Sequence, residues 1–204
     1  MKYPKVRELV EAIKALLTGP YTLKKPMEPA VRFRGKPEYS DEGCIGCAAC
    51  ALVCPGRVIE VVDVIAEDKA TRKMVLHLDE CHYCGQCSAL CTTRDDDPPG
   101  IKHTTKYDLA SFDRSDMISS AKEKELALCE TCGDVVTTKA HLEWLARRLG
   151  PLAFSNPTLF VASLKNMGFS EDVLGTVKDG LLKRSDRIKV LCSKCRRSTT
   201  IEKF

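Results

Sequence analysis

Apolar side chains recur at helical spacing in three parts of the chain. Residues 4–18 place Val, Leu and Ile three or four positions apart with charged residues between them, which predicts an amphipathic helix ending at Gly19-Pro20. The same spacing predicts a helix from Lys139 to Leu149 and marks a further apolar-periodic stretch from Glu171 to Leu182. The first helix could cover a core, lie on a membrane surface or pack on a partner subunit. A segment rich in proline follows it and is expected to lead it away from the compact part of the chain.

Two runs in the middle of the chain have the composition of strands. Val58 to Ile65 and Lys73 to Leu78 are short and rich in apolar β-formers, and they are expected to pair as a hairpin. Residues 92–100 contain Asp, Pro and Gly in a cluster, which predicts a loop. A second unit is predicted to begin near Asp116.

Positive charge is concentrated at the start of the chain. Residues 1–40 carry nine Lys or Arg and four Asp or Glu, a balance of +5, whereas the other 164 residues have a balance of −1. A basic arm suits docking on an acidic partner, an anionic lipid surface or nucleic acid. It is equally typical of a solvated terminal segment.

Whether the cysteines form disulfides or bind metal depends on the redox state of the compartment that holds the chain. The first 20 residues do not match a secretory signal, because Glu8, Glu11 and Lys14 interrupt the apolar stretch. No apolar run reaches the roughly 18 residues that a transmembrane helix needs. A chain without an export signal is expected to stay in a reducing compartment, where disulfides are rare. The twelve cysteines are therefore expected to be metal ligands.

Eight of these cysteines form an internal repeat. Residues 44–54 follow the spacing C-x₂-C-x₂-C-x₃-C, and residues 81–91 repeat it. Three thiolates at this spacing bind three corners of one cubane 4Fe–4S cluster, and the fourth cysteine of each run ligates the other cluster. Two clusters held in this way are expected to lie close enough to exchange electrons. The predicted ligand sets are Cys44, Cys47, Cys50 and Cys91 for cluster 1, and Cys81, Cys84, Cys87 and Cys54 for cluster 2.

Zinc knuckles or plain buried thiols are the alternatives for these eight cysteines. Zinc sites usually use paired Cys-x-x-Cys, and not triples with a fourth cysteine three residues on. Small residues such as Gly46, Ala48 and Gly85 let the backbone wrap closely around a cluster. The second repeat departs from the first after its last cysteine, where Thr92 stands at the position of Pro55. The loop geometry is expected to differ there, while the ligands remain intact.

The chain has no sequence motif for binding or converting a substrate. It contains no Gly-x-Gly-x-x-Gly run, no phosphate-binding loop and no Ser-His-Asp set. The four histidines are isolated and are expected to be surface or packing residues, although His82 beside Cys81 could tune a cluster electrostatically. We therefore expect electron transfer without a catalytic residue in this chain.

The last four cysteines form two Cys-x-x-Cys pairs, Cys129 with Cys132 and Cys192 with Cys195, separated by 59 residues. Four thiolates suit a tetrahedral site for structural zinc, which we favour, or for a rubredoxin-type iron. A helical insertion must then fold out between the pairs. Inert thiol pairs or a redox-active disulfide are the alternatives. Basic residues beside the second pair could contact nucleic acid, but the interleaved aromatics that stack on single strands are absent there.

Two segments carry a resemblance to a known family. The arm at 32–38, RFRGKPE, followed by CIGCAAC at 44–50, resembles the two-cluster ferredoxin-like subunit of formate hydrogenlyase and of related energy-converting, membrane-bound NiFe-hydrogenases. These subunits are in turn similar to the 23 kDa iron–sulfur subunit of complex I. Residues 106–109, KYDL, match a further segment, so that the resemblance covers about residues 1–118. The cysteine-rich C-terminal extension favours the hydrogenase branch.

The resemblance implies a function in a complex. Electrons from a formate-oxidising module, another dehydrogenase or a ferredoxin would cross both clusters to the small hydrogenase subunit and so reach the large subunit with its NiFe site. The N-terminal helix would lie against membrane-arm subunits on the cytoplasmic side, as part of a peripheral subunit. The alternatives are a complex I-like relay between NADH or ferredoxin and quinone, a free ferredoxin with a zinc module, and a metal-stabilised nucleic-acid-binding protein. The free carrier is disfavoured because such proteins are usually acidic and compact.

The expected fold is α+β. A bacterial ferredoxin-like domain with two 4Fe–4S clusters is predicted at residues 41–115, preceded by the amphipathic helix and docking arm at 1–40. A small four-cysteine metal-knuckle domain with a helical insertion is predicted at 116–204. Nucleic acid is not an expected partner.

Overall fold

A computed structural model describes residues 5–19, 28–66, 69–168 and 189–201. The apolar-periodic stretch noted at 171–182 lies outside the described residues. The chain divides into two compact units, Met1–Phe33 and Arg34–Phe204. Within the described residues, no helix combines the length and the apolar character needed to cross a bilayer.

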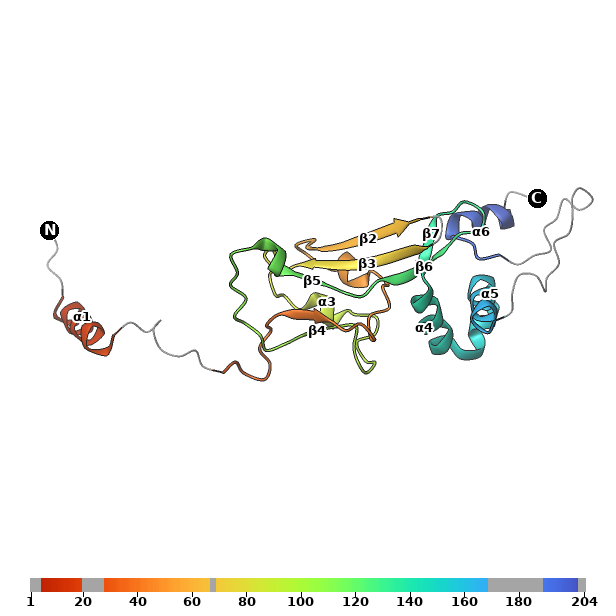
Figure 1. Ribbon diagram of the computed structural model, residues 1–204. Coiled ribbons are helices and arrows are strands. Elements are labelled where there is room, and N and C mark those ends of the chain that lie inside the picture. Colours follow the sequence, from red (N-terminus) through yellow and green to blue (C-terminus); the bar gives the residue numbers. More distant parts are fainter. Residues whose placement is uncertain (1–4, 20–27, 67–68, 169–188, 202–204) are drawn as a thin grey trace, which may run out of the picture. The chain divides into compact units, whose positions relative to one another are not determined.

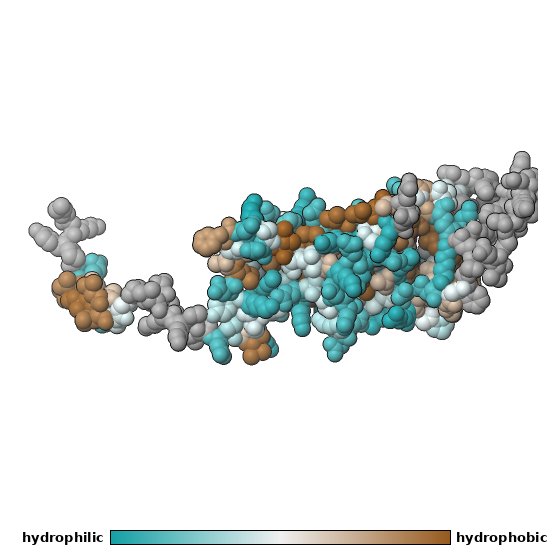
Figure 2. Space-filling model, viewed as in Figure 1, coloured by the Kyte–Doolittle hydropathy of each residue, from teal (hydrophilic) through white to brown (hydrophobic). Residues whose placement is uncertain are grey.

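The first unit contains the helix α1 (Val6–Thr18), which confirms the amphipathic helix predicted at its start. Gly19 follows it with a φ of 69°, a conformation that favours glycine and ends the helix. No residue of α1 is buried, and Leu9, Leu16 and Leu17 are 57%, 84% and 82% exposed. Figure 2 shows the apolar side chains gathered on this helix. Its apolar stripe is therefore exposed among the described residues of its own unit.

The second unit is built on two antiparallel sheets (Figure 1). Its strands are β1 (Pro37–Tyr39), β2 (Ile59–Ile65), β3 (Ala70–His77), β4 (Ile101–His103), β5 (Ile118–Ser120), β6 (Lys124–Leu128) and β7 (Val135–Thr138). Its helical elements are α2 (Ala49–Leu52), α3 (Gln86–Ala89), the 3₁₀ turn η2 (Arg114–Met117), α4 (Lys139–Leu149), the 3₁₀ segment η3 (Gly150–Ser155), α5 (Pro157–Asn166) and α6 (Ser193–Ile201). The small sheet pairs β1 with β4, and the larger sheet has the order β2-β3-β6-β7, with β5 also paired to β3.

The hairpin of β2 and β3 is the centre of the larger sheet. Its register runs from Ile59 opposite Leu76 to Ile65 opposite Ala70, which confirms the predicted pairing of these two segments. The strand β3 begins three residues before the predicted start at Lys73, because a partner strand and an ion pair hold its polar first residues in place. Thr71 pairs with Glu125 of β6, and the Arg72 guanidinium contacts the Asp63 carboxylate at 2.7 Å.

The core of this part lies on one face of β3. Met74 and Leu76 are each 1% exposed, and Leu78 just beyond the strand is 2% exposed. This alternation is the period of two expected for a strand with one buried face. The cysteine loops pack on these residues, since Cys44, Cys50, Cys54, Cys81 and Cys87 belong to the same cluster of contacts.

The C-terminal part of the unit adds a helical layer beside β6 and β7 (Figure 1). The helix α4 spans the predicted Lys139–Leu149 and begins where the Thr138 hydroxyl accepts a hydrogen bond from the His141 N–H. Its buried Leu142 packs with Ala153 of η3 and Leu159 of α5. In the sequence, these helices lie between the two C-terminal Cys-x-x-Cys pairs.

Candidate metal centres

The eight cysteines of the repeat line two separate cavities, four to each. The first, cavity 1, is lined by the predicted cluster-1 cysteines, Cys44, Cys47, Cys50 and Cys91. The second, cavity 2, is lined by the predicted cluster-2 cysteines, Cys54, Cys81, Cys84 and Cys87. Each cavity therefore draws three cysteines from one repeat and the fourth from the other.

The two cysteine loops wind in the same way despite their different sequences. In the first, Gly46 and Ala48 have φ angles of 67° and 65°, and at the matching positions of the second, Tyr83 and Gly85 have 51° and 83°. These left-handed residues let a loop turn around a centre, with backbone N–H groups directed inward. The Tyr83 N–H donates to Cys81 Sγ at 3.4 Å. A one-turn helix, α2 or α3, follows each loop.

Burial makes several of these thiols hard to ionise by themselves. It raises the pKa of Cys50 to about 12 and that of Cys87 to about 11. Burial also raises the pKa of Cys44 and Cys81. Such thiols become thiolates when a metal takes the place of the proton, as in iron–sulfur ligation. Four such groups around each cavity are a donor set that fits a 4Fe–4S cluster.

Side-chain hydroxyls contact the sulfurs of cavity 1. The Tyr39 hydroxyl lies 3.7 Å from Cys50 Sγ, and the Thr92 hydroxyl lies 3.1 Å from Cys47 Sγ. Burial, followed by the nearby Cys50 thiol, raises the pKa of Tyr39, so that its hydroxyl keeps its proton. Both hydroxyls can therefore donate to a thiolate.

The next threonine, Thr93, has a structural role beside cavity 1. It is 3% exposed, its hydroxyl donates to the Gly43 carbonyl at 2.9 Å, and it accepts from the Gly100 N–H at 3.0 Å. A Cβ on Gly100 would lie 2.7 Å from the Thr93 hydroxyl and 3.1 Å from Cys91 Sγ, so glycine is needed there. These bonds close the loop that follows Cys91, where the first repeat has Pro55 after Cys54.

Cavity 2 has cationic and imidazole groups near it. The Arg34 guanidinium donates to the Cys84 carbonyl at 2.6 Å. Two histidines, His82 and His103, line the cavity. The Nδ1 of His103 bonds the Gly35 carbonyl at 2.8 Å, and its Nε2 is buried without a hydrogen-bond partner among the described residues. The Gly35 carbonyl can only accept, so Nδ1 carries the hydrogen of the neutral ring and Nε2 is left as an acceptor.

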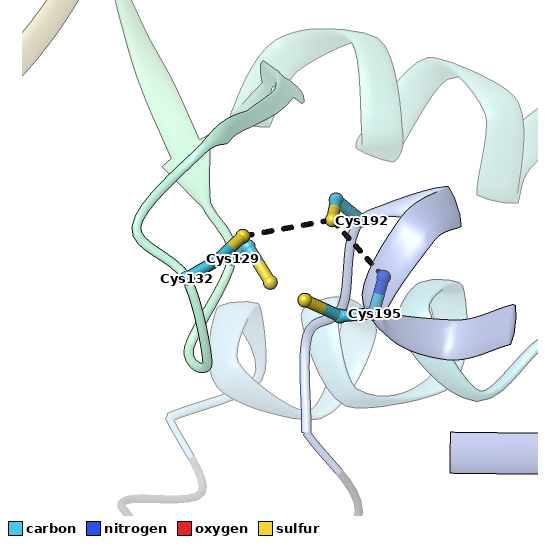
Figure 3. Close-up of side chains that lie close together, drawn as sticks. All are labelled: Cys129, Cys132, Cys192 and Cys195. Carbon is cyan, nitrogen blue, oxygen red and sulfur yellow. Dashed lines mark hydrogen bonds between the residues drawn. The ribbon is translucent and has the colours of Figure 1, made fainter. Parts of the chain in front are cut away.

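The four C-terminal cysteines converge on one point (Figure 3). Their sulfurs all lie within 4.8 Å of one another, and Cys132 Sγ lies 3.7 Å from Cys192 Sγ. A disulfide requires about 2.05 Å between sulfurs, and all twelve cysteines are free. A tetrahedron with metal–sulfur bonds of about 2.3 Å has edges of about 3.8 Å. The arrangement thus fits one tetrahedral metal ion, and we name it the C-terminal four-cysteine site.

Two segments distant in sequence build this site. Cys129 directly follows β6, and the Gly133 N–H bonds the Cys129 carbonyl at 2.9 Å in a tight turn with a φ of 75° at the glycine. Cys192 precedes α6, whose Cys195 N–H donates to Cys192 Sγ at 3.4 Å (Figure 3). The Glu130 N–H bonds the Val190 carbonyl at 3.0 Å and joins the two segments.

The local electrostatics of this site favour a thiolate at one of the four cysteines, Cys129, whereas the pKa of Cys132 and of Cys195 is raised. Burial opposes ionisation of Cys129, but N–H groups of Cys192, Cys132 and Thr131 outweigh it and lower the pKa of the Cys129 thiol. An anionic sulfur surrounded by three others attracts a cation.

Contacts also connect the C-terminal part to cavity 1. The Thr138 hydroxyl donates to the Ile45 carbonyl, in the loop between the first two cluster-1 cysteines, at 2.5 Å. The Trp144 Nε1–H of α4 donates to the Asp96 carboxylate, in the loop after Cys91, at 2.6 Å. The C-terminal part therefore contacts both the loop between Cys44 and Cys47 and the loop after Cys91.

The sequence did not indicate several of these neighbours. Tyr39 and Arg34 stand outside the cysteine runs, and His103, predicted to be a surface or packing residue, packs at the wall of cavity 2. The replacement of proline by Thr92 was visible, but its contact with Cys47 depends on the fold. His82 lines cavity 2, and its electrostatic role stays a prediction.

Comparisons with known proteins match these centres. The family model described as a 4Fe-4S dicluster domain matches residues 43–94, which include all eight cysteines of the repeat. Formate hydrogenlyase subunit 6 of Escherichia coli (strain K12) is 31% identical over 134 residues, which cover 64% of this chain and 70% of that protein.

Other relatives share a shorter part. NAD(P)H-quinone oxidoreductase subunit I of Synechococcus sp. (strain CC9902) is 32% identical over 122 residues, 53% of this chain and 57% of that protein. A chain in the structure of the membrane-bound sulfane sulfur reductase (MBS), an archaeal respiratory membrane complex, is 24% identical, with a TM-score of 0.35 over 57% of this chain and 61% of that chain.

Proposed function

Since the chain belongs to the family of two-cluster iron–sulfur electron-transfer subunits that includes formate hydrogenlyase subunit 6, we propose that it relays electrons within a membrane-bound oxidoreductase complex of the hydrogenase type. The observation that carries the proposal is the distribution of eight cysteines over two cavities, four to each. A 4Fe–4S cluster bound at each cavity supplies one-electron exchange. The chain holds these groups and sets their surroundings, and catalysis belongs to partner subunits.

The proposed ligand sets cross between the repeats. Cys91 of the second repeat joins the first three cysteines of the first repeat at cluster 1, and Cys54 joins those of the second repeat at cluster 2. The cavity linings support this assignment, because they divide the eight cysteines in the same way.

The closeness of the cavities supports a relay. Met74 lines cavity 1 and Leu76 lines cavity 2. These residues lie two positions apart on the buried face of β3, a separation of about 7 Å along a strand. Electrons entering at one centre therefore have a neighbouring acceptor within the same chain.

We propose a structural zinc ion at the C-terminal four-cysteine site, and not a rubredoxin-type iron. The site joins two segments about sixty residues apart in the sequence and so holds the helical layer between them. Four protein ligands that join distant segments are typical of a structural zinc site. Metal analysis of the purified chain tests this: one zinc per chain is expected, and iron in excess of the two clusters contradicts it.

We further propose that the N-terminal part docks the subunit. The exposed apolar stripe of α1 and the balance of +5 over residues 1–40 suit membrane-arm subunits beside an anionic surface. The proposed location is the cytoplasmic side of the membrane, as a peripheral subunit. The proposed division is 1–40 for docking, 41–115 for the clusters and 116–204 for the four-cysteine domain.

A complex I-like setting is the second candidate. The match to a quinone oxidoreductase subunit at 32% identity favours it, although it covers only 53% of this chain. In that setting, the electrons would come from NADH or ferredoxin and pass toward quinone.

Purification from native membranes in a mild detergent tests the proposal. Co-purifying small and large hydrogenase subunits are the expected result, together with a dehydrogenase or ferredoxin as donor. Quinone oxidoreductase subunits would select the second candidate, and an isolated monomer would contradict both.

The docking role needs a matched pair of variants. Leu9→Gln with Leu16→Gln weakens the apolar stripe without changing the charge, and should reduce the membrane-bound fraction. Glu11→Gln with Lys14→Gln removes an exposed ion pair at 3.2 Å, also without a net charge change, and should leave that fraction unaltered. Equal behaviour of the two variants would refute docking through α1.

A further inference from the structure

The two cavities differ in the hydrogen-bond donors that face their sulfurs. In cavity 1 the Thr92 hydroxyl lies 3.1 Å from Cys47 Sγ, and the Tyr39 hydroxyl lies 3.7 Å from Cys50 Sγ. In cavity 2 the Tyr83 backbone N–H donates to Cys81 Sγ at 3.4 Å, and the Ser88 hydroxyl next to Cys87 donates to the Gly85 carbonyl. The asymmetry comes from the sequence itself, because Pro55 occupies the position after Cys54 that Thr92 occupies after Cys91.

Ligation fixes which atom donates in the contact between Thr92 and Cys47. A cysteine bound to iron has lost its proton, so the thiolate can only accept. The hydroxyl hydrogen of Thr92 is then the only hydrogen available between the two atoms. Cys47 is the hydrogen-bond partner of that hydroxyl among the described residues.

The neighbouring threonine provides an internal contrast. Thr93 lies 3.5 Å from Cys91 Sγ, but its single hydrogen is directed to the Gly43 carbonyl at 2.9 Å. It therefore stabilises the loop and gives no hydrogen bond to sulfur. Thr92 therefore contacts a predicted cluster ligand, whereas Thr93 bonds the backbone.

We propose that Thr92, assisted by Tyr39, is a positioning residue that raises the reduction potential of cluster 1 relative to cluster 2. This inference rests on the proposed cluster assignment. A donor aimed at a ligand sulfur stabilises the state with more negative charge, which is the reduced one. The hydrogen bond therefore stabilises the reduced state of the cluster held by Cys44, Cys47, Cys50 and Cys91.

The test is a redox titration followed by EPR on the anaerobically purified full chain. Thr92→Val keeps the side-chain shape and removes the donor, whereas Thr92→Ser keeps the donor. The matched control is Ser88→Ala, which removes a hydroxyl next to Cys87 whose hydrogen bond goes to the Gly85 carbonyl at 3.0 Å.

Thr92→Val should lower one of the two midpoint potentials and leave the other in place. The expected fall corresponds to at least a threefold change in the reduction equilibrium constant, or about 28 mV for one electron, since tenfold is about 59 mV. Thr92→Ser should restore the wild-type value, and Ser88→Ala should leave that midpoint unchanged. Tyr39→Phe, on a different element, should lower the same midpoint as Thr92→Val.

Iron and sulfide content shows whether a negative result contradicts the proposed function or only the role of Thr92. A wild-type chain without iron would overturn the proposed function itself. Two intact clusters with the same midpoints in Thr92→Val as in wild type, or equal shifts at both clusters, would overturn the inference alone. If Thr92→Val does not retain its iron, Tyr39→Phe decides by the same criterion.

Discussion

The bond between Thr138 and Ile45 gives a prediction of stability that can be worked from the structure. Thr138 is fully buried, donates to the Ile45 carbonyl beside cavity 1 and accepts from the His141 N–H at the start of α4. Thr138→Val removes both bonds while nearly conserving shape. A lost N-cap costs about 1 kcal/mol, and an unsatisfied buried carbonyl costs about 1–3 kcal/mol. The expected loss in free energy of unfolding is therefore about 2–4 kcal/mol.

The assay is denaturant unfolding of the cluster-loaded chain under anaerobic conditions, followed by helical circular dichroism and by the visible absorbance of the clusters. Thr138→Ser is the control, since it keeps the hydroxyl and loses one buried methyl, worth about 1 kcal/mol. Two results would refute the reasoning: a Thr138→Val chain within about 0.5 kcal/mol of wild type, or a Ser variant as unstable as the Val variant.

Three further predictions concern the other groups. Cys54→Ser and Cys81→Ser should each remove the same EPR signal, and Cys50→Ser should remove the other one. Loss of the same signal in Cys54→Ser and Cys50→Ser would contradict crossed ligation. Burial, followed by the charge of Arg72, lowers the pKa of His141 in the folded state. Below the ordinary imidazole pKa of about 6.5, the unfolded state therefore binds a proton that the folded state does not. Stability should fall as pH drops through that value, and unfolding of His141→Gln in urea at several pH values should show a smaller fall. Chelation of the metal at the C-terminal four-cysteine site should make the segment after β6 sensitive to protease while both clusters remain, and unchanged resistance would contradict a structural metal there.

The elements that the sequence predicted well depend on short-range patterns. The helix α4 has the predicted bounds because its apolar spacing and the capping Thr138 are local features. The strand pair of β2 and β3 was predicted for the same reason. The start of β3 was missed, since Thr71 and Arg72 are polar and are held by β6 and by Asp63, which are distant in sequence.

The centres show the same division between local and long-range information. Cysteine spacing led to both predicted ligand sets, because iron–sulfur loops place their ligands at fixed short intervals. Some groups that line the cavities come from elsewhere in the chain: Tyr39 from β1 and His103 from β4. The pairing of β1 with β4 joins segments more than sixty residues apart, and local spacing does not predict such a pairing.

The central claim is most directly tested by measuring iron, sulfide and zinc in anaerobically purified protein, together with EPR of the reduced state. Two clusters require about eight irons and eight sulfides per chain, and neighbouring reduced clusters should give interacting EPR signals. One zinc should accompany them at the C-terminal four-cysteine site. Iron near zero after anaerobic handling, with zinc bound by the repeat cysteines, would contradict the electron-relay account.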